Sequence, residues 1–339
     1  MHREGVKERL DYVADEGKRA LMCFSPVRTL RQLAFFAPTV EPFATVGVSQ
    51  ALLDRFFADV LPKFRHPIVL VTSDYNSDRS APKPFETDHS AMLDHPLVAH
   101  WFSDNWGGPP RHAKLTQVPL GLSMNCFQEG LSGDQILLRA VAEAMPLARD
   151  KPVRVLANFH HSEDQGWWDA PVSGGRPDRR EALAALRNMT TGAGRSHKEE
   201  EAEEEEEEEE GLPIVFTESR GGTKECWQSH ADFLFEISPQ GNGLDCYRTW
   251  EALLLQTIPI VRSSTLDPLY DGLPVAIVDS WEDVTVERLA IWRRELLPLF
   301  ETGEVARRLD HELWATRLWR MQQQHKAAAA AAAATAAAA

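Results

Sequence analysis

Apolar and polar positions along the chain follow two periods, one typical of helices and one of buried strands. Short β-branched runs such as residues 67–72 (PIVLVT) indicate strands, and longer segments with apolar side chains three or four apart indicate helices. The predicted strands are 67–72, 114–122, 153–159, 214–217, 233–237, 258–261 and 275–278. The predicted helices are 49–64, 91–101, 135–148, 178–188, 245–256, 287–300 and 304–320.

Strands that alternate with helices predict parallel sheets covered by helices, an α/β fold. In such sheets ligands bind beyond the carboxyl ends of the strands, so the loops after strands are the places to look for a site. We place a boundary near Asp150, which gives an N-terminal domain of residues 21–150 and a C-terminal domain of residues 151–325.

Two segments do not fit a folded core. The run Glu199–Glu210 contains eleven glutamates and one alanine. It repels itself and cannot bury a face, so residues 191–211 are predicted to be a disordered, solvated insertion. Residues 326–339 form an alanine-rich tail with no sign of function.

The acidic run also distorts the overall charge. The chain carries 36 Lys and Arg against 51 Asp and Glu, a formal net charge of −15. Without the eleven glutamates the balance is 36 against 40, or −4, so the folded part is only mildly acidic. A nucleic-acid binder would show a basic footprint, and we expect no nucleic-acid partner. The four cysteines lie far apart without a CxxC pair, which argues against a thiolate zinc site.

Residues 233–261 predict a strand, a glycine-rich turn, a helix and a second strand. Gly241 and Gly243 are expected to take positive φ and to let the backbone approach a ligand. Asp245 is a candidate N-cap for the helix, whose N-terminus suits a phosphate. Arg248 and Glu251 lie three residues apart on one helix face. Arg248 could neutralise a diphosphate, and Glu251 could accept hydrogen bonds from ribose hydroxyls. The same pair could equally be an exposed helix contact.

The string SPQGNGLDCYRTWEALLLQTIPIV, residues 238–261, resembles the signature of exostosin-type glycosyltransferases and their relatives, including the ribitol xylosyltransferase-like C-terminal domain. The likeness continues through residues 264–281. Weaker likeness extends upstream through residues 69–74, 100–105 and 114–122, and coverage is about 65–300 with the acidic segment as an insertion.

The resemblance implies a GT-B fold, with two Rossmann-like domains and a cleft between them. It implies inverting transfer of a sugar from a nucleotide-sugar donor to a glycan or glycoprotein acceptor, without an essential metal or other cofactor. Residues carried over by position would bind the donor, with Arg248 neutralising the diphosphate and Glu251 holding the ribose. The donor-binding set is Ser238, Gly241, Asn242, Gly243, Asp245, Arg248 and Glu251.

The acceptor hydroxyl must also lose a proton, which requires a carboxylate or histidine of the N-terminal half. Asp74 follows an apolar strand and is the candidate base, although aspartate is also common in turns. Asp74 and Asp78 form DxxxD and not the tight DxD of a metal-dependent site, so no metal ligands are predicted. Asp104 and Asn105 are expected to follow a helix as turn or cap residues.

Two other functions compete with this prediction. A Rossmann dehydrogenase would need G-x-G-x-x-G after an early strand, but Cys246 stands where the third small residue belongs. A non-catalytic sugar- or nucleotide-binding protein with a retained fold is the second alternative. It differs from the enzyme in lacking an N-terminal carboxylate that faces Arg248.

The resemblance implies a Golgi membrane or secretory location. The sequence itself shows neither a signal peptide nor a transmembrane segment. The first 18 residues are charged throughout, and the apolar stretch 30–48 is interrupted by two charged residues and two prolines. Whether the chain continues upstream of Met1 stays open.

Overall fold

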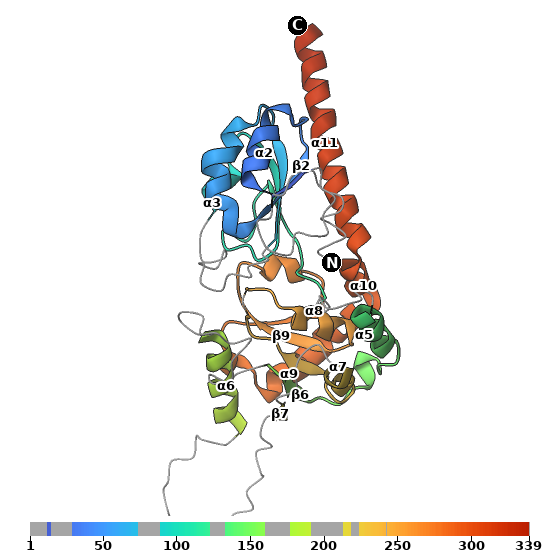
Figure 1. Ribbon diagram of the computed structural model, residues 1–339. Helices are drawn as coiled ribbons and strands as arrows, with labels where there is room; N and C mark the ends of the chain where they lie inside the picture. Colours follow the sequence, from blue (N-terminus) through green and yellow to red (C-terminus); the bar gives the residue numbers. More distant parts are fainter. Residues whose placement is uncertain are drawn as a thin grey trace, which may run out of the picture.

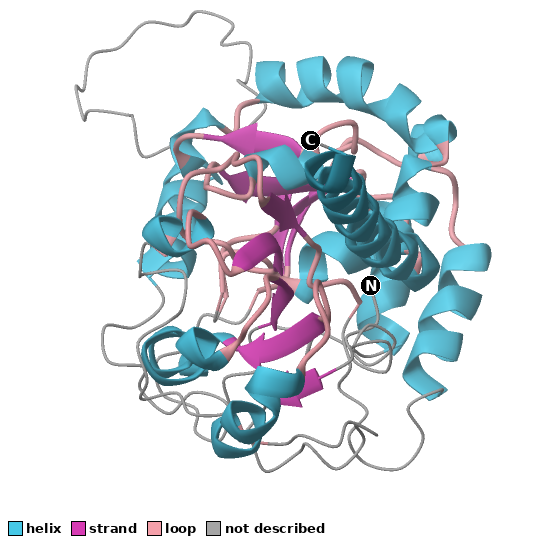
Figure 2. Ribbon diagram, turned by 90° about the horizontal axis from the view of Figure 1, so that it is seen from above, coloured by secondary structure: helices cyan, strands magenta, loops and turns pink. Residues whose placement is uncertain are grey.

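The computed structural model of the protein describes residues 12–14, 29–73, 89–122, 133–159, 177–190, 213–217, 224–241 and 243–338. Within these residues the chain forms two five-stranded sheets, and every neighbouring pair of strands is parallel. Helices lie on both sides of the strands (Figure 2). The predicted α/β fold with two parallel-sheet halves is confirmed. The predicted acidic insertion, residues 191–211, lies outside the described residues.

The first sheet belongs to the N-terminal half, drawn in blue and teal in Figure 1. Its described strands follow one another in sequence order. Ile68, Val69 and Leu70 in its centre are fully buried, as in parallel strands covered on both faces. The strands are β1 (Tyr12–Ala14), β2 (Thr45–Ser49), β3 (Ile68–Ser73), β4 (Val98–Ser103) and β5 (Leu115–Gln117).

The segment predicted as a helix over residues 49–64 is helical but changes type along its length. A 3₁₀ turn, Gln50–Leu52, leads into α3 (Leu53–Arg55). A π-helical turn, Phe56–Val60, and a 3₁₀ turn, Leu61–Lys63, follow. Proline at position 62 has no N–H to donate, so the helical hydrogen-bond pattern cannot continue unchanged. The apolar face points inward as predicted, because Phe56 and Val60 are buried.

The predicted helix over residues 91–101 is wrong for most of its length. Only a single turn, α4 (Ser90–Leu93), is helical, and Val98–Ser103 forms strand β4. All residues of β4 except Ala99 are buried, so the strand shows no alternation of apolar and polar positions. Periodicity alone cannot separate such a run from a buried helix. The half also contains α2 (Leu30–Phe36), which is followed by a 3₁₀ turn, Ala37–Thr39.

The second sheet has the strand order β10-β9-β8-β6-β7. The chain adds β7 on one side of β6 and β8 on the other, so the strand order reverses between β6 and β8. In open parallel sheets a crevice for ligands forms at this switch point, beyond the carboxyl ends of the strands. The strands are β6 (Val155–Ala157), β7 (Ile214–Phe216), β8 (Phe235–Ile237), β9 (Ile258–Arg262) and β10 (Ala276–Val278).

Alternate residues of β8 divide the second half into two layers. Phe235 and Ile237 pack in a core with side chains of α6 (Pro177–Thr190) and α9 (Val286–Leu296). Glu236, between them, contacts residues from the other layer. That layer contains α7 (Lys224–Ser229), the 3₁₀ turn His230–Asp232 and α8 (Tyr247–Leu254).

Two helices pack against the half to which the predicted boundary does not assign them. In Figure 1, α5 (Gly133–Glu143) lies beside α7 in the C-terminal half, although it precedes the predicted boundary at Asp150. The long α11 (His311–Ala338) runs from the C-terminal half along the N-terminal half. There His325 stacks on Phe43 with ring centroids 5.5 Å apart. The alanine-rich tail continues this helix. The remaining elements are the 3₁₀ segments Ala148–Asp150, Asp267–Tyr270, Trp281–Asp283 and Leu297–Thr302, and α10 (Glu304–Leu309).

The carboxyl edges of the two sheets face each other. Asn105 and Leu120 follow the ends of β4 and β5, and both hydrogen-bond to Asp245, which follows β8. Loops after strands of both halves therefore meet at one place. None of the helices in the described ranges is both long and apolar enough to span a bilayer.

Candidate functional site

The loop that follows β8 lies at the switch point of the second sheet and is held from several sides. The Ser238 N–H donates to Ile260 O at 2.8 Å, and the Ser238 hydroxyl lies 2.9 Å from that of Thr249 on α8. Gln240 N donates to Asp178 Oδ2 at 2.7 Å. These bonds fix the backbone on which the predicted donor-binding residues stand.

The glycines of this loop are needed for space and not for conformation. The prediction of positive φ at Gly241 and Gly243 is wrong, since neither residue adopts it. A Cβ on Gly243 would lie 2.7 Å from Asn105 Cγ and 2.9 Å from its Nδ2. Glycine therefore allows the amide side chain of the N-terminal half to pass against the loop backbone. Asn105 itself has a φ of 48°, which asparagine tolerates better than most residues.

Asp245 does not cap the helix, which corrects that prediction. Helix α8 begins at Tyr247 with Cys246 as its N-cap, and no described side chain caps it. The Asp245 carboxylate is 2% exposed and accepts from Leu120 N at 2.7 Å, Cys246 N at 2.9 Å and Trp250 Nε1 at 2.8 Å. Burial raises the pKa of Asp245 to about 6, although these hydrogen bonds oppose the shift. Asp245 therefore connects the two halves and holds the backbone between the glycine-rich loop and α8 in place.

The first turn of α8 carries no acidic side chain, and Arg248 and Glu251 share one face of the helix. Glu251 accepts from Trp227 Nε1 at 3.1 Å through Oε2. Arg248 Nε lies 3.7 Å from Glu236 Oε1. The Glu251 side chain is buried, so the alternative of an exposed helix pair does not describe it.

Four buried polar atoms in this region make no hydrogen bond to any described residue. Two of them, Arg248 Nη1 and Glu251 Oε1, belong to predicted site residues. The others are Glu236 Oε1 in β8 and Asn158 Oδ1 at the end of β6. Their residues are linked through α7, since Asn158 Nδ2 donates to Cys226 Sγ at 3.3 Å and Trp227 donates to Glu251. An unsatisfied buried polar atom costs about 1–3 kcal/mol, so a group of four indicates a site arranged for ligand contacts.

Burial and nearby charges shift the pKa values of two buried side chains in this region, Glu251 and Lys151. Burial raises the pKa of Glu251, and the nearby charge of Glu236 adds to the shift. Burial lowers the pKa of Lys151 to about 7, against the opposing charge of Glu236. Lys151 Nζ donates to His230 O, Leu255 O and Thr257 Oγ1 at 2.6–2.8 Å, which ties the end of α8 to the neighbouring turn.

Two groups that belong to this region were not predicted as site residues from the sequence. Arg179 of α6 donates from Nε to Gln240 O at 3.2 Å, and its Nη2 would lie 3.2 Å from a Cβ on Gly241. It therefore brings a second cation to the glycine-rich loop from 61 residues upstream of Gln240. The second group is Glu236, a charged residue within the apolar run FLFEI. A charge inside a predicted strand was the feature of the sequence that could have identified it.

Asp74 and Asn242 lie outside the described residues. The residue before Asp74, Ser73, ends β3. Asp104 and Asn105 follow strand β4 and not a helix. Among the residues that the structure describes, no group of three or more His, Cys, Asp or Glu side chains could hold a metal ion. The described cysteines, Cys226 and Cys246, are both buried.

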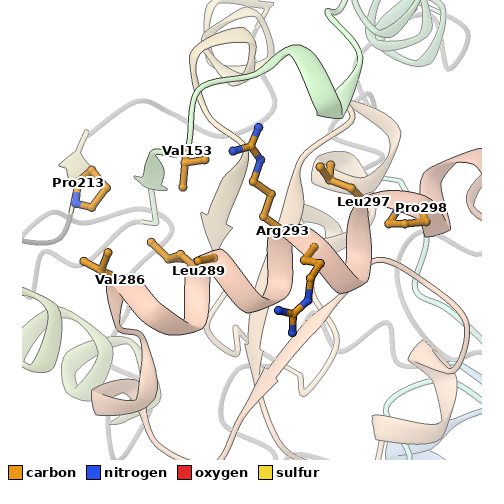
Figure 3. Close-up of a pocket in the computed structure, with 9 residues that line it drawn as sticks. Val153, Pro213, Val286, Leu289, Arg293, Leu297 and Pro298 are labelled. Carbon is orange, nitrogen blue, oxygen red and sulfur yellow. The ribbon is translucent and has the colours of Figure 1, made fainter.

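A cavity of about 830 Å³ lies elsewhere in the C-terminal half. Figure 3 shows its apolar wall on α9, opposite residues that precede β6 and β7. It is therefore at the amino edge of the sheet, and no predicted site residue lines it. Its lining includes Val153, Pro213, Val286, Leu289, Arg293 and Leu297.

Comparisons with known proteins add little to this geometry. No family model and no curated protein matches the sequence. Among solved structures, the chain is similar to an alpha,alpha-trehalose-phosphate synthase (UDP-forming) from Burkholderia vietnamiensis, with a TM-score of 0.39 and 10% sequence identity. That match covers 89% of this chain and 78% of the other. At this level of similarity the match identifies no shared activity.

Proposed function

We propose that this protein is a glycosyltransferase that moves a sugar from a nucleotide-sugar donor to a glycan or glycoprotein acceptor. The observation that carries the proposal is the pair of unused buried atoms on α8, Arg248 Nη1 and Glu251 Oε1, beside the switch point of the second sheet. Arg248 Nη1 can donate a hydrogen bond and Glu251 Oε1 can accept one, so the pair matches a ligand that offers both phosphate oxygens and hydroxyl groups. The exostosin-like string 238–261 supports the same assignment.

The donor's diphosphate is assigned to the loop Ser238–Gly243 and the start of α8. The uncapped helix N-terminus provides N–H groups and the positive end of the helix dipole. Arg179 of α6 donates to Gln240 O in the loop, and Arg248 lies in the first turn of the helix that follows the loop, so we assign both cations to the diphosphate. Asn242 lies between the two glycines and remains part of the proposed set.

The donor's ribose is assigned to Glu251. Trp227 fixes Oε2, which leaves Oε1 to accept a hydrogen bond from a ribose hydroxyl. Hydrogen-bond donors stabilise the charged form of a carboxylate. Ligand binding is therefore expected to lower the pKa of Glu251 from its raised value in the free protein.

The proposed reaction is an inverting transfer without a metal. The acceptor oxygen forms a bond to the anomeric carbon, while the bond from that carbon to the diphosphate oxygen breaks and its electron pair leaves with the diphosphate. Arg248 stabilises the charge that develops there. The proton of the acceptor hydroxyl passes to a base of the N-terminal half, for which Asp74 remains the candidate. A Golgi or secretory location belongs to the same proposal.

The test is nucleotide binding to matched variants. A panel of UDP-, GDP- and CMP-sugars and the free nucleotides UDP, GDP and CMP is screened by thermal shift on the wild type and on the double variant Arg248→Lys/Glu251→Gln. These substitutions keep approximate size and limit unfolding. A ligand at about 100 times its Kd should stabilise the wild type by roughly 2.7 kcal/mol. We expect one nucleotide class to do so, and the double variant to lose the response.

The matched control is Glu304→Gln/Arg307→Lys, which changes an ion pair of the same spacing on α10. Its response should equal that of the wild type. If a well-folded wild type binds none of these nucleotides, the donor-site proposal is wrong. If it binds a nucleotide sugar but neither hydrolyses nor transfers it, the non-catalytic alternative replaces the enzyme.

A further inference from the structure

Glu236 is a fully buried carboxylate in the middle strand of the second sheet. Its neighbours in the chain, Phe235 and Ile237, pack in the apolar core on the other side of the strand. A buried charge of this kind costs several kcal/mol unless it is paired, and an apolar residue could fill the same volume. Packing therefore does not explain why a glutamate occupies this position. The explanation must lie in the residues with which Glu236 interacts.

The first partner is His230, which lies in the turn after α7. His230 Nε2 is 3.0 Å from Glu236 Oε2, and His230 Nδ1 is 2.9 Å from Cys226 O. A carbonyl oxygen and a carboxylate both accept hydrogen bonds, so the imidazole donates from both nitrogens and carries a positive charge. Burial opposes this charge, but the adjacent Glu236 outweighs it and raises the pKa of His230.

The second partner is Arg248, on the other carboxylate oxygen. Its Nε lies 3.7 Å from Glu236 Oε1, a distance at which charges attract but no hydrogen bond forms. His230 lies on Oε2, and Oε1 accepts no hydrogen bond from any described residue, so Glu236 does not make with Arg248 the two parallel bonds typical of an arginine–carboxylate pair. Arg248 therefore lies near Glu236 by charge attraction, while its Nη1 donates to no described residue.

We propose that Glu236, fixed by His230, is a positioning residue that orients Arg248 and leaves its guanidinium available to an anionic ligand. His230 and Arg248 together carry two positive charges against the single negative charge of Glu236, so the trio retains a net positive charge for a diphosphate. The role of this ligand rests on the proposed function. The orientation of Arg248 by Glu236 does not.

The first measurement uses the ligand-free protein. The proton–nitrogen NMR signal of the Arg248 Nε–H is assigned by its loss in Arg248→Lys. We expect the chemical shift of this signal to change in Glu236→Gln, because that substitution removes the negative charge that lies 3.7 Å from Arg248 Nε. Glu236→Asp returns the charge with a shorter side chain and should restore the signal in part. An Arg248 signal that is the same in the wild type and in both Glu236 variants overturns the proposal.

The second measurement is the affinity for UDP and for GDP of the wild type, Glu236→Gln, Arg248→Lys and the double variant. Glu236→Gln should weaken binding by about tenfold, which corresponds to the lower end of the effect found for residues that orient the ligands of metal sites. Because Glu236 acts through Arg248, adding Glu236→Gln to Arg248→Lys should weaken binding no further. A residue that only maintains the fold would give effects that multiply, and this result would also overturn the proposal.

The two measurements separate the two proposals. If the wild type binds neither nucleotide but the Arg248 signal responds to Glu236→Gln, the orientation stands and the proposed donor site is wrong. If the wild type binds and the signal does not respond, the donor site stands and the positioning role is wrong. Should Glu236→Gln fail to fold, Glu236→Asp carries both measurements, with smaller changes expected in the same direction.

Discussion

Two buried carboxylates of the C-terminal half, Asp245 and Glu236, are used in opposite ways. Asp245 lies where the two halves meet, and both of its oxygens accept hydrogen bonds from the protein. Glu236 lies in the charged cluster beside α8, and among the described residues only His230 donates to it, which leaves Oε1 without a hydrogen bond. We call Asp245 with Leu120, Cys246 and Trp250 the joint, and its hydrogen bonds are complete in the free protein. We call Glu236 with His230, Arg248, Glu251 and Lys151 the cluster, and described residues leave some of its hydrogen-bonding atoms without a partner.

This difference separates support from function. A buried charge whose hydrogen bonds are all made by the chain contributes to stability, because removing it leaves its donors unpaired. A buried group with bonds still to make costs stability in the free protein, and such conflicts are expected at functional sites. The predictions below test whether the joint and the cluster respond as these roles require.

The largest expected effect is the pH dependence of the free energy of unfolding that Lys151 of the cluster causes. In the folded protein burial lowers the pKa of Lys151 to about 7, whereas in the unfolded chain it stays near its ordinary value of 10.5. Between these values the unfolded chain binds more protons, so the free energy of unfolding should rise with pH by up to about 1.4 kcal/mol per unit. Lys151 alone contributes about 3.5 kcal/mol to this rise from pH 7 to pH 10, measured as the difference between the wild type and Lys151→Met in urea unfolding at each pH.

Lys151→Met should abolish this rise, since methionine does not titrate. The control is Lys63→Met on the exposed 3₁₀ turn of the N-terminal half, which should keep it. A wild type and a Lys151→Met variant with the same pH dependence from 7 to 10 would show that Lys151 does not titrate in this way.

Breaking the joint should cost almost as much. Asp245→Ala removes the acceptor of Leu120 N and Trp250 Nε1, both in buried surroundings. Because each unsatisfied buried donor costs about 1–3 kcal/mol, we expect a loss of about 3 kcal/mol in urea or thermal unfolding at pH 7. Asp245→Asn keeps an oxygen acceptor and should cost less than half as much. An Asp245→Ala protein as stable as the wild type would remove Asp245 from the joint.

Asp245 also shows what the sequence could and could not provide. Local patterns identified the strand, turn and helix of residues 233–261, because hydrophobic periodicity and glycine spacing act over a few residues. The partner of Asp245 at Leu120 is 125 residues away, and no local pattern predicts such a contact. For this reason the sequence assigned Asp245 to a helix cap and to the ligand.

The same limit explains the other differences. The segment 91–101 contains a fully buried strand, whose uniform apolar character hides its period. Gly243 is glycine because Asn105 of the other half lies against it, which the sequence could not show. Arg179 reaches the site through the packing of α6 on the loop. Strand order, which places the switch point between β6 and β8, follows from long-range pairing alone.

A smaller effect is expected from crowding the joint. In Gly243→Ala the new Cβ would lie within 3 Å of the Asn105 side chain, which is itself buried. Overpacking of this kind typically costs about 1–3 kcal/mol, and we expect about 2 kcal/mol in thermal unfolding. Asn105→Gly removes the clashing amide and accepts the positive φ of that position, so the double variant should lose less stability than the two single effects added together. Additive losses would contradict a direct contact.

The smallest expected effect tests whether the joint depends on its buried part. Arg111 Nη2 and Asp271 Oδ2 form an ion pair across the two halves at 2.7 Å, but their side chains are 71% and 60% exposed. Water screens such pairs, and ordering two mobile side chains offsets most of the attraction, so they contribute about 0–1 kcal/mol. Arg111→Ala should therefore change the free energy of unfolding by less than about 0.5 kcal/mol. Urea unfolding at low and high salt checks this, because a loss that approaches the effect of Asp245→Ala at low salt would place the strength of the joint at its surface.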